Sequence, residues 1–167
     1  MISAFLKKLL FVRQFSIEDG KIEMLGGREV MLPSSFIFAI QDNKDIYEIS
    51  KKLTFEKIKE LGDKIGSSED GLIRNVKDIY ETFGLGPLEI INLKNKEKEA
   101  IIAIKDSTIA KEYLKLKKQS KGPQCVLIAG ILAGMFSYLF ESDVNAIESK
   151  CSCSGSPYCL FNIKKNK

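Results

Sequence analysis

The chain of 167 residues contains no histidine and no tryptophan. Histidine is the one side chain whose unperturbed pKa lies close to neutrality, so acid–base catalysis here would require a shifted glutamate, lysine or cysteine. This absence argues against an enzyme, and the sequence offers no candidate catalytic residue. Any transition-metal site would have to be built from thiolates and carboxylates.

Long hydrophobic runs are also missing. The longest apolar run, Val126 to Phe140, has fifteen residues without a charge, whereas a membrane-spanning helix needs about twenty. We therefore expect no membrane span and a buried helix at the centre of the domain. Residues 1–15 lack the pattern of a secretory signal. They predict an amphipathic helix that packs on the domain or a partner subunit, with a membrane-surface anchor as the alternative, and a cytoplasmic location.

Charge is balanced rather than concentrated. Charged residues make up 29% of the chain and the formal net charge is +4. The basic residues are spread along the sequence, so no nucleic-acid partner is expected.

The hydrophobic spacing predicts several helices and three hairpins. Asp19-Gly20 between alternating apolar residues is a strong hairpin signal. Helical spacing dominates up to Phe83, and β-rich runs at 88–93 and 100–104 form a second hairpin. Residues 144–150 and 158–163 form the third. We expect a single domain over residues 1–167, with a mainly helical part (1–87) and a β–α–α–β–β part (88–167).

All four cysteines lie in the second of these parts. Cys125 is near the start of the apolar helix, where free backbone N–H groups favour a thiolate. Cys151 and Cys159 flank the tip of the last hairpin, so strand pairing would bring them together. A helix end and a hairpin would thus supply three of the four ligands of a tetrahedral zinc ion.

The fourth ligand is left open by the spacing. Cys153 is the nearest candidate, and Glu148 and Asp106 are carboxylate alternatives. The spacing is not a standard C-x-x-C knuckle, so two other interpretations remain. One is a redox dithiol formed by Cys151 and Cys153, and the other is cysteines without a ligand.

Three motifs in this region resemble a known family. They are Cys125-Val-Leu-Ile-Ala-Gly-Ile-Leu-Ala-Gly134, then Glu148-Ser-Lys-Cys151, then Gly155-Ser-Pro-Tyr-Cys159-Leu-Phe161. Their order resembles the 4-vinyl reductase domain family, also described as a hydrocarbon-binding domain and related in fold to transport-particle subunits of Golgi trafficking. The resemblance covers residues 88–163.

The resemblance implies an α/β domain of the α+β type, in which a four-stranded antiparallel sheet packs against helices, usually as a homodimer. An N-terminal helical and hairpin extension precedes it. Phenol-sensing members hold an aromatic effector beside a structural zinc, which implies metal ligation by Cys125, Cys151 and Cys159. At the position matched to a further ligand, a glutamate, this chain has Ile109. Cys153 is therefore the preferred fourth ligand.

These observations favour a stand-alone domain that binds or senses an apolar or aromatic small molecule. The residues expected to line its pocket are Phe83, Tyr113, Leu132, Met135 and Phe136. The first alternative is a reductase acting on a tetrapyrrole vinyl group, although the chain has no G-x-G-x-x-G motif for a nucleotide. The second is a scaffold subunit of a larger assembly.

Overall fold

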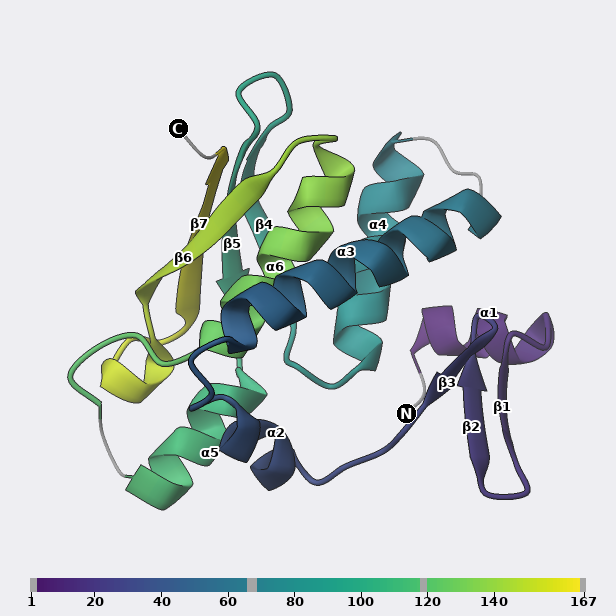
Figure 1. Ribbon diagram of the computed structural model, residues 1–167, viewed down its shortest axis with the longest axis horizontal. Helices are drawn as coiled ribbons and strands as arrows, with labels where there is room; N and C mark the ends of the chain where they lie inside the picture. The colour runs from purple at the N-terminus through teal and green to yellow at the C-terminus, as the bar shows by residue number, and fades with distance from the viewer. Residues whose placement is uncertain (1–2, 66–68, 118–119, 166–167) are drawn as a thin grey trace. The chain divides into compact units, whose positions relative to one another are not determined.

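The structure is a computed structural model that describes residues 3–65, 69–117 and 120–165 (Figure 1). It divides into two compact units, Met1–Pro33 and Ser34–Lys167, and each is described here by itself. The single domain expected over residues 1–167 stays a prediction.

The first unit is a short helix followed by a small sheet. Helix α1 (Ala4–Phe11) begins at Ser3, whose hydroxyl accepts the Leu6 N–H at 3.1 Å. Strands β1 (Phe15–Glu18), β2 (Lys21–Met24) and β3 (Gly27–Glu29) form an antiparallel sheet in chain order. Asp19 and Gly20 both have positive φ, at 50° and 73°, as the turn of a two-residue hairpin requires. The predicted first hairpin is confirmed.

The second unit combines five helices with a four-stranded sheet in the described residues. Its elements are α2 (Ser34–Ile40), α3 (Ile46–Ile65), α4 (Glu69–Thr82), β4 (Leu88–Lys94), β5 (Glu99–Ile104), α5 (Thr108–Lys117), α6 (Val126–Leu139), β6 (Val144–Lys150), the single 3-10 turn η1 (Ser152–Ser154) and β7 (Cys159–Lys165). All strand pairs are antiparallel, in the order β4-β5-β7-β6. The predicted fold class is thus confirmed, including both later hairpins.

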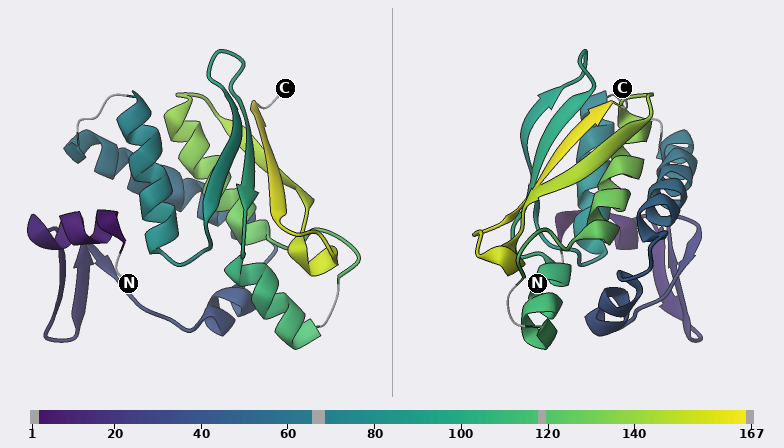
Figure 2. Two further views of the ribbon diagram at one scale, coloured as in Figure 1. Left: turned by 180° about the vertical axis from the view of Figure 1, so that it is seen from behind. Right: turned by 60° about the vertical axis from the view of Figure 1, so that its left-hand side comes forward.

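Helix α6 lies at the centre of this unit. The sheet packs against one side of it, and α3 crosses the other side (Figure 2). Ten of its residues are buried, in keeping with its nearly uniform apolar character. Within the described residues, no helix has both the length and the hydrophobicity needed to cross a membrane.

Two glycines allow α3 to approach α6 closely. A Cβ atom at Gly130 would overlap the Ser50 side chain, and one at Gly134 would overlap the Lys51 carbonyl oxygen. The G-x-x-x-G pair therefore serves close helix packing inside the protein.

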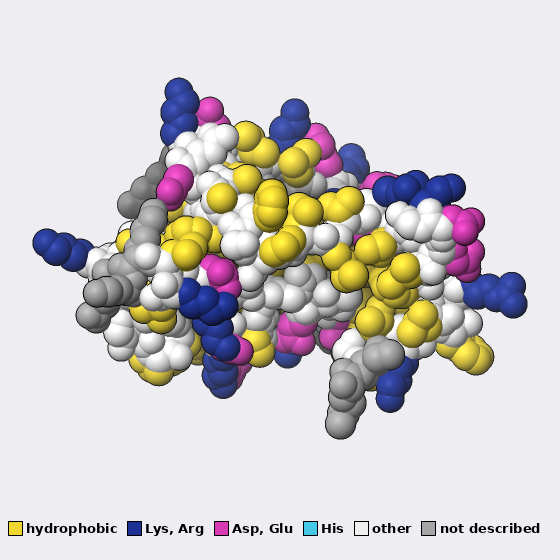
Figure 3. Space-filling view, turned by 90° about the horizontal axis from the view of Figure 1, so that it is seen from below, with side chains coloured by type: hydrophobic (Ala, Val, Ile, Leu, Met, Phe, Trp, Pro, Cys, Tyr) yellow, Lys and Arg dark blue, Asp and Glu magenta, His cyan; other side chains and the backbone are white. Residues whose placement is uncertain are grey.

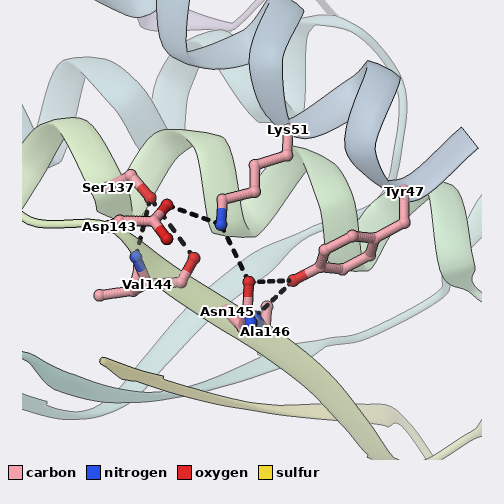
Figure 4. A network of polar contacts seen from close by, with 7 residues as sticks. All are labelled: Tyr47, Lys51, Ser137, Asp143, Val144, Asn145 and Ala146. Atoms are coloured by element: carbon pink, nitrogen blue, oxygen red, sulfur yellow. Dashed lines mark hydrogen bonds and ion pairs between the residues drawn. The ribbon is translucent and has the colours of Figure 1, made fainter. Parts of the chain in front are cut away.

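Polar side chains of α3 cover the outer edge of β6 (Figure 4). The Tyr47 hydroxyl accepts the Ala146 N–H at 3.0 Å and donates to Asn145 Oδ1 at 3.2 Å. Lys51 Nζ donates to the same Asn145 oxygen at 2.9 Å and pairs with Asp143 at 2.7 Å. These bonds satisfy an edge strand that would otherwise expose unpaired backbone groups.

The glycine contact makes a direct prediction about stability. Gly134→Ala should lower the free energy of unfolding by about 1–3 kcal/mol, because the added methyl forces two backbones apart. Gly122→Ala is the matched control, since a Cβ there meets nothing within 4 Å. Urea denaturation measures both; equal stabilities for the two variants would contradict the packing described.

Candidate functional site

Three buried thiols converge where α6 begins and the β6–β7 hairpin turns. The Sγ atoms of Cys125, Cys151 and Cys159 form a triangle with sides of 3.7, 3.7 and 3.8 Å. All three residues have 0% exposure. A tetrahedral metal with sulfur bonds of about 2.3 Å separates its sulfur ligands by about 3.8 Å. The triangle therefore has the dimensions of one face of such a site.

Local structure explains how each thiol reaches this point. Cys125 is the N-cap of α6, which begins at Val126 and so slightly later than Gly122-Pro123 would suggest. Cys159 opens β7, where alternation places it on the buried face with Phe161 and Ile163. Cys151 follows β6 and caps η1 in an extended conformation.

Glu148 completes the group. Its carboxylate and the three thiols have ligand atoms within 4.8 Å of one another, and such a group could hold a metal ion. Oε2 accepts the backbone N–H groups of Gln124 and Cys125, both at 2.8 Å. Oε1 is buried without a hydrogen-bond partner. Anchoring the start of α6 explains the first oxygen, but only a further partner explains the second.

The other fourth-ligand candidates are placed differently. Cys153 lies outside the group of four, with its Sγ 2.9 Å from Cys151 Sγ. Asp106 is exposed and forms an ion pair with Lys111, and Ile109 is fully buried. The geometry favours Glu148 over the preferred Cys153, whose role as a ligand stays a prediction. The E-x-x-C spacing was the signal for Glu148 in the sequence.

The thiols share protons unevenly. Hydrogen bonds from Cys125 and Cys159 lower the pKa of Cys151 to about 3, whereas the hydrogen bond to Cys151 raises the pKa of Cys125. Burial raises the pKa of Glu148 to about 7. A bound cation would replace these shared protons, because thiolates and carboxylates ligate metals in their deprotonated forms.

A small apolar cavity lies among α3, α4 and α6. Its volume is about 240 Å³, whereas an engineered apolar cavity of about 150 Å³ is large enough to bind benzene. Its lining residues are Leu53, Thr54, Lys57, Ile58, Ile79, Tyr80, Phe83, Leu85, Ile131 and Met135. Leu53 and Phe83 are 59% and 45% exposed, so they mark its opening.

A larger open groove of about 1150 Å³ runs along α3 beside β6. Charged residues such as Glu48, Lys52 and Lys59 line it. This mixed surface is poorly suited to an apolar molecule.

The structure brings together two of the five residues expected to line a pocket. Phe83 and Met135 both line the cavity. Tyr113 instead packs edge-on against Phe38, with ring centroids 5.9 Å apart. Leu132 and Phe136 are fully buried and are not among the cavity's lining residues. The sequence analysis did not select the α3 residues or Tyr80, whose only signal was helical spacing.

Tyr80 connects the cavity with the thiols. Its side chain lines the cavity, while its hydroxyl is buried without a hydrogen-bond partner. Burial, followed by the negative charge of Cys125 and Cys159, raises its pKa well above the usual tyrosine value. The hydroxyl is therefore within electrostatic reach of the cysteine cluster.

Residues 101–165 match the family model of the V-4-R (4-vinyl reductase) domain. MJ0150 of Methanocaldococcus jannaschii is 29% identical over 119 residues, which cover 71% of this chain and 62% of that protein. MJ1460 of the same organism is 28% identical over 144 residues, covering 74% of this chain and 86% of that protein. This chain thus spans less than two thirds of MJ0150.

Solved structures share the fold. The phenol-responsive sensory domain of the transcription activator PoxR, with phenol, has a TM-score of 0.76 at 17% identity, covering 98% of this chain and 92% of that one. A vinyl-4-reductase family protein of Methanocaldococcus jannaschii has a TM-score of 0.59 at 21% identity, with 100% and 98% covered. Trafficking protein particle complex subunit 3 of Naegleria fowleri, covalently bound to palmitic acid, has a TM-score of 0.51 at 16% identity, with 82% and 84% covered.

The chain carries a 4-vinyl reductase domain over residues 101–165. This confirms the resemblance that the cysteine motifs suggested. The matched segment includes all four cysteines and Glu148.

The geometry predicts which residues complete a metal site. Titration with Co²⁺, whose thiolate charge-transfer absorption reports sulfur ligands, should show three thiolates. Glu148→Gln should weaken Co²⁺ binding at least tenfold, because a ligand oxygen is replaced by a poorer donor. Cys153→Ser should leave affinity and spectrum unchanged. Loss of about a quarter of the charge-transfer intensity in a Cys153→Ser sample with four sulfur ligands in the wild type would make Cys153 the fourth ligand.

Proposed function

We propose that this chain, with its 4-vinyl reductase domain, is a ligand-binding or sensory domain whose ligand is a small apolar or aromatic molecule. The ligand would occupy the cavity among α3, α4 and α6, next to a structural zinc centre. The observation that carries the proposal is the apolar cavity itself, which shares Tyr80 with the surroundings of the cysteine cluster.

Zinc is the metal that best suits the donor set. Three thiolates and one carboxylate from a chain without histidine match the ligands that zinc accepts in tetrahedral geometry. The ligand atoms are supplied by four buried residues. Four protein ligands leave no open coordination position, which is typical of structural rather than catalytic zinc.

The zinc would join segments that are distant in the sequence. Cys125 belongs to the start of α6, Glu148 to β6 and Cys159 to β7. Neighbouring donors support the thiolates: the Ser152 N–H donates to Cys159 Sγ at 3.4 Å, and the Ser107 hydroxyl lies 3.7 Å from Cys125 Sγ. Such outer contacts orient metal ligands.

The cavity chemistry supports a neutral, apolar ligand. Only Thr54, Lys57 and Tyr80 among its lining residues carry polar groups in the side chain. Small-molecule sites are commonly apolar clefts with a few polar groups of this kind. The fold is shared with a domain that responds to phenol and with a subunit bound to palmitic acid. These neighbours support apolar ligands as the class to test.

A homodimer in the cytoplasm is also part of the proposal. Figure 3 shows hydrophobic side chains on the surface viewed from below, the side of α2 and α5. In these helices Phe36, Ile40, Leu114 and Leu116 are exposed. Exposed apolar groups of this kind are frequent at protein–protein interfaces, and they support the predicted dimer.

Filling the cavity tests the ligand proposal. The wild-type protein should bind toluene, and Ile131→Trp should weaken that binding at least tenfold, because the indole ring takes up the space. Ile147→Trp, on the exposed face of β6 (69% exposed), is the control and should bind as the wild type does. Isothermal titration calorimetry measures all three. Failure of the wild type to bind apolar ring compounds, or equal binding by Ile131→Trp, would contradict the proposal.

A further inference from the structure

Cys153 is the buried thiol that the group of four ligands does not use. It lies in η1, the single turn between Cys151 and Gly155, and is 0% exposed. Its Sγ lies 2.9 Å from Cys151 Sγ, whereas the three sides of the thiol triangle are 3.7–3.8 Å. A second polar neighbour is the Gly122 carbonyl oxygen, at 4.0 Å. A free thiol therefore sits directly against a candidate metal ligand.

The turn holds these two thiols on the same side. The Cys151 carbonyl oxygen accepts the N–H groups of Ser154 and Ser156, at 3.1 and 3.2 Å. Gly155 closes the turn with φ of 95°, a conformation that favours glycine. Ser152, between the two cysteines, donates its N–H to Cys159 Sγ. The two sulfurs thus face each other because of the backbone.

We propose that Cys151 and Cys153 are an oxidation site, and that a peroxide converts them to a disulfide and so removes Cys151 from the metal. This inference rests on the proposed metal centre. One thiolate, one thiol, one proton and hydrogen peroxide give one disulfide and two water molecules. Sulfur loses two electrons and the O–O bond is reduced and broken. A disulfide requires an S–S distance of about 2.0 Å, so the sulfurs must close by only about 0.9 Å.

The consequence for the metal follows from the ligand count. After oxidation, Cys125, Cys159 and Glu148 remain, so the closed set of four ligands becomes three. The metal loses affinity, and the link between the start of α6 and the hairpin is broken. A dithiol reductant reverses the reaction by thiol–disulfide exchange and restores the site.

Both thiols are buried, and this sets the expected rate. Backbone contacts cover the turn, since the Ser120 N–H donates to the Cys153 carbonyl oxygen at 2.9 Å. We therefore expect oxidation on the timescale of local opening of this turn, slower than for an exposed thiol.

The test uses the zinc-loaded chain and hydrogen peroxide. Zinc release is followed with a colorimetric chelator, and disulfides are mapped by mass spectrometry after free thiols are blocked. The wild type should release zinc as its mass falls by about 2 Da, with the bond mapped to Cys151 and Cys153. Cys153→Ser should bind zinc normally and release it at least tenfold more slowly. Ser154→Ala, in the same turn, should behave as the wild type does.

The possible results separate this inference from the proposed function. If the wild type binds no metal, the zinc centre fails, and disulfide mapping in the metal-free chain still decides whether Cys151 and Cys153 pair. Equal rates of release for wild type and Cys153→Ser would overturn the inference, as would a disulfide mapped to Cys125 or Cys159. Cys153→Ala replaces Cys153→Ser if the serine variant does not fold.

Discussion

The convergence of Cys125, Glu148, Cys151 and Cys159 in the protein interior is the constraint on which the C-terminal half depends. Four groups that can each carry a negative charge are expensive to bury together unless protons or a cation compensate them. The hydrogen bonds among the thiols provide partial compensation, and Oε1 of Glu148 remains without a partner. A divalent cation would satisfy all four groups at once and would fix α6 to the last two strands.

Helix α6 links this centre to the cavity. Its start supplies Cys125, its glycine face meets α3, and Ile131 and Met135 reach the cavity. Tyr80 of α4 lines the same cavity and lies within electrostatic reach of the thiols. One rigid, apolar helix therefore connects the proposed metal centre, the close helix packing and the proposed ligand site.

Much of this arrangement could be predicted from local patterns. Alternation placed Cys159 on the buried face of its strand, and Asp19-Gly20 marked its hairpin. The choice between Glu148 and Cys153 could not be made in this way, because a register shift between Glu148 and Lys150 and the η1 turn decide where these side chains point. The cavity also escaped prediction. Its wall joins α3, α4 and α6, and helical spacing does not report which neighbouring helix faces a given stripe.

Amide hydrogen exchange of the zinc-loaded chain, with and without a chelator, tests the central claim that a metal joins α6 to the hairpin. Removing the metal should speed exchange in residues 124–128 and 151–161. Exchange in residues 130–135, where α6 packs against α3, should change little. Unchanged exchange at the start of α6 and at the hairpin tip after complete metal removal would contradict the account.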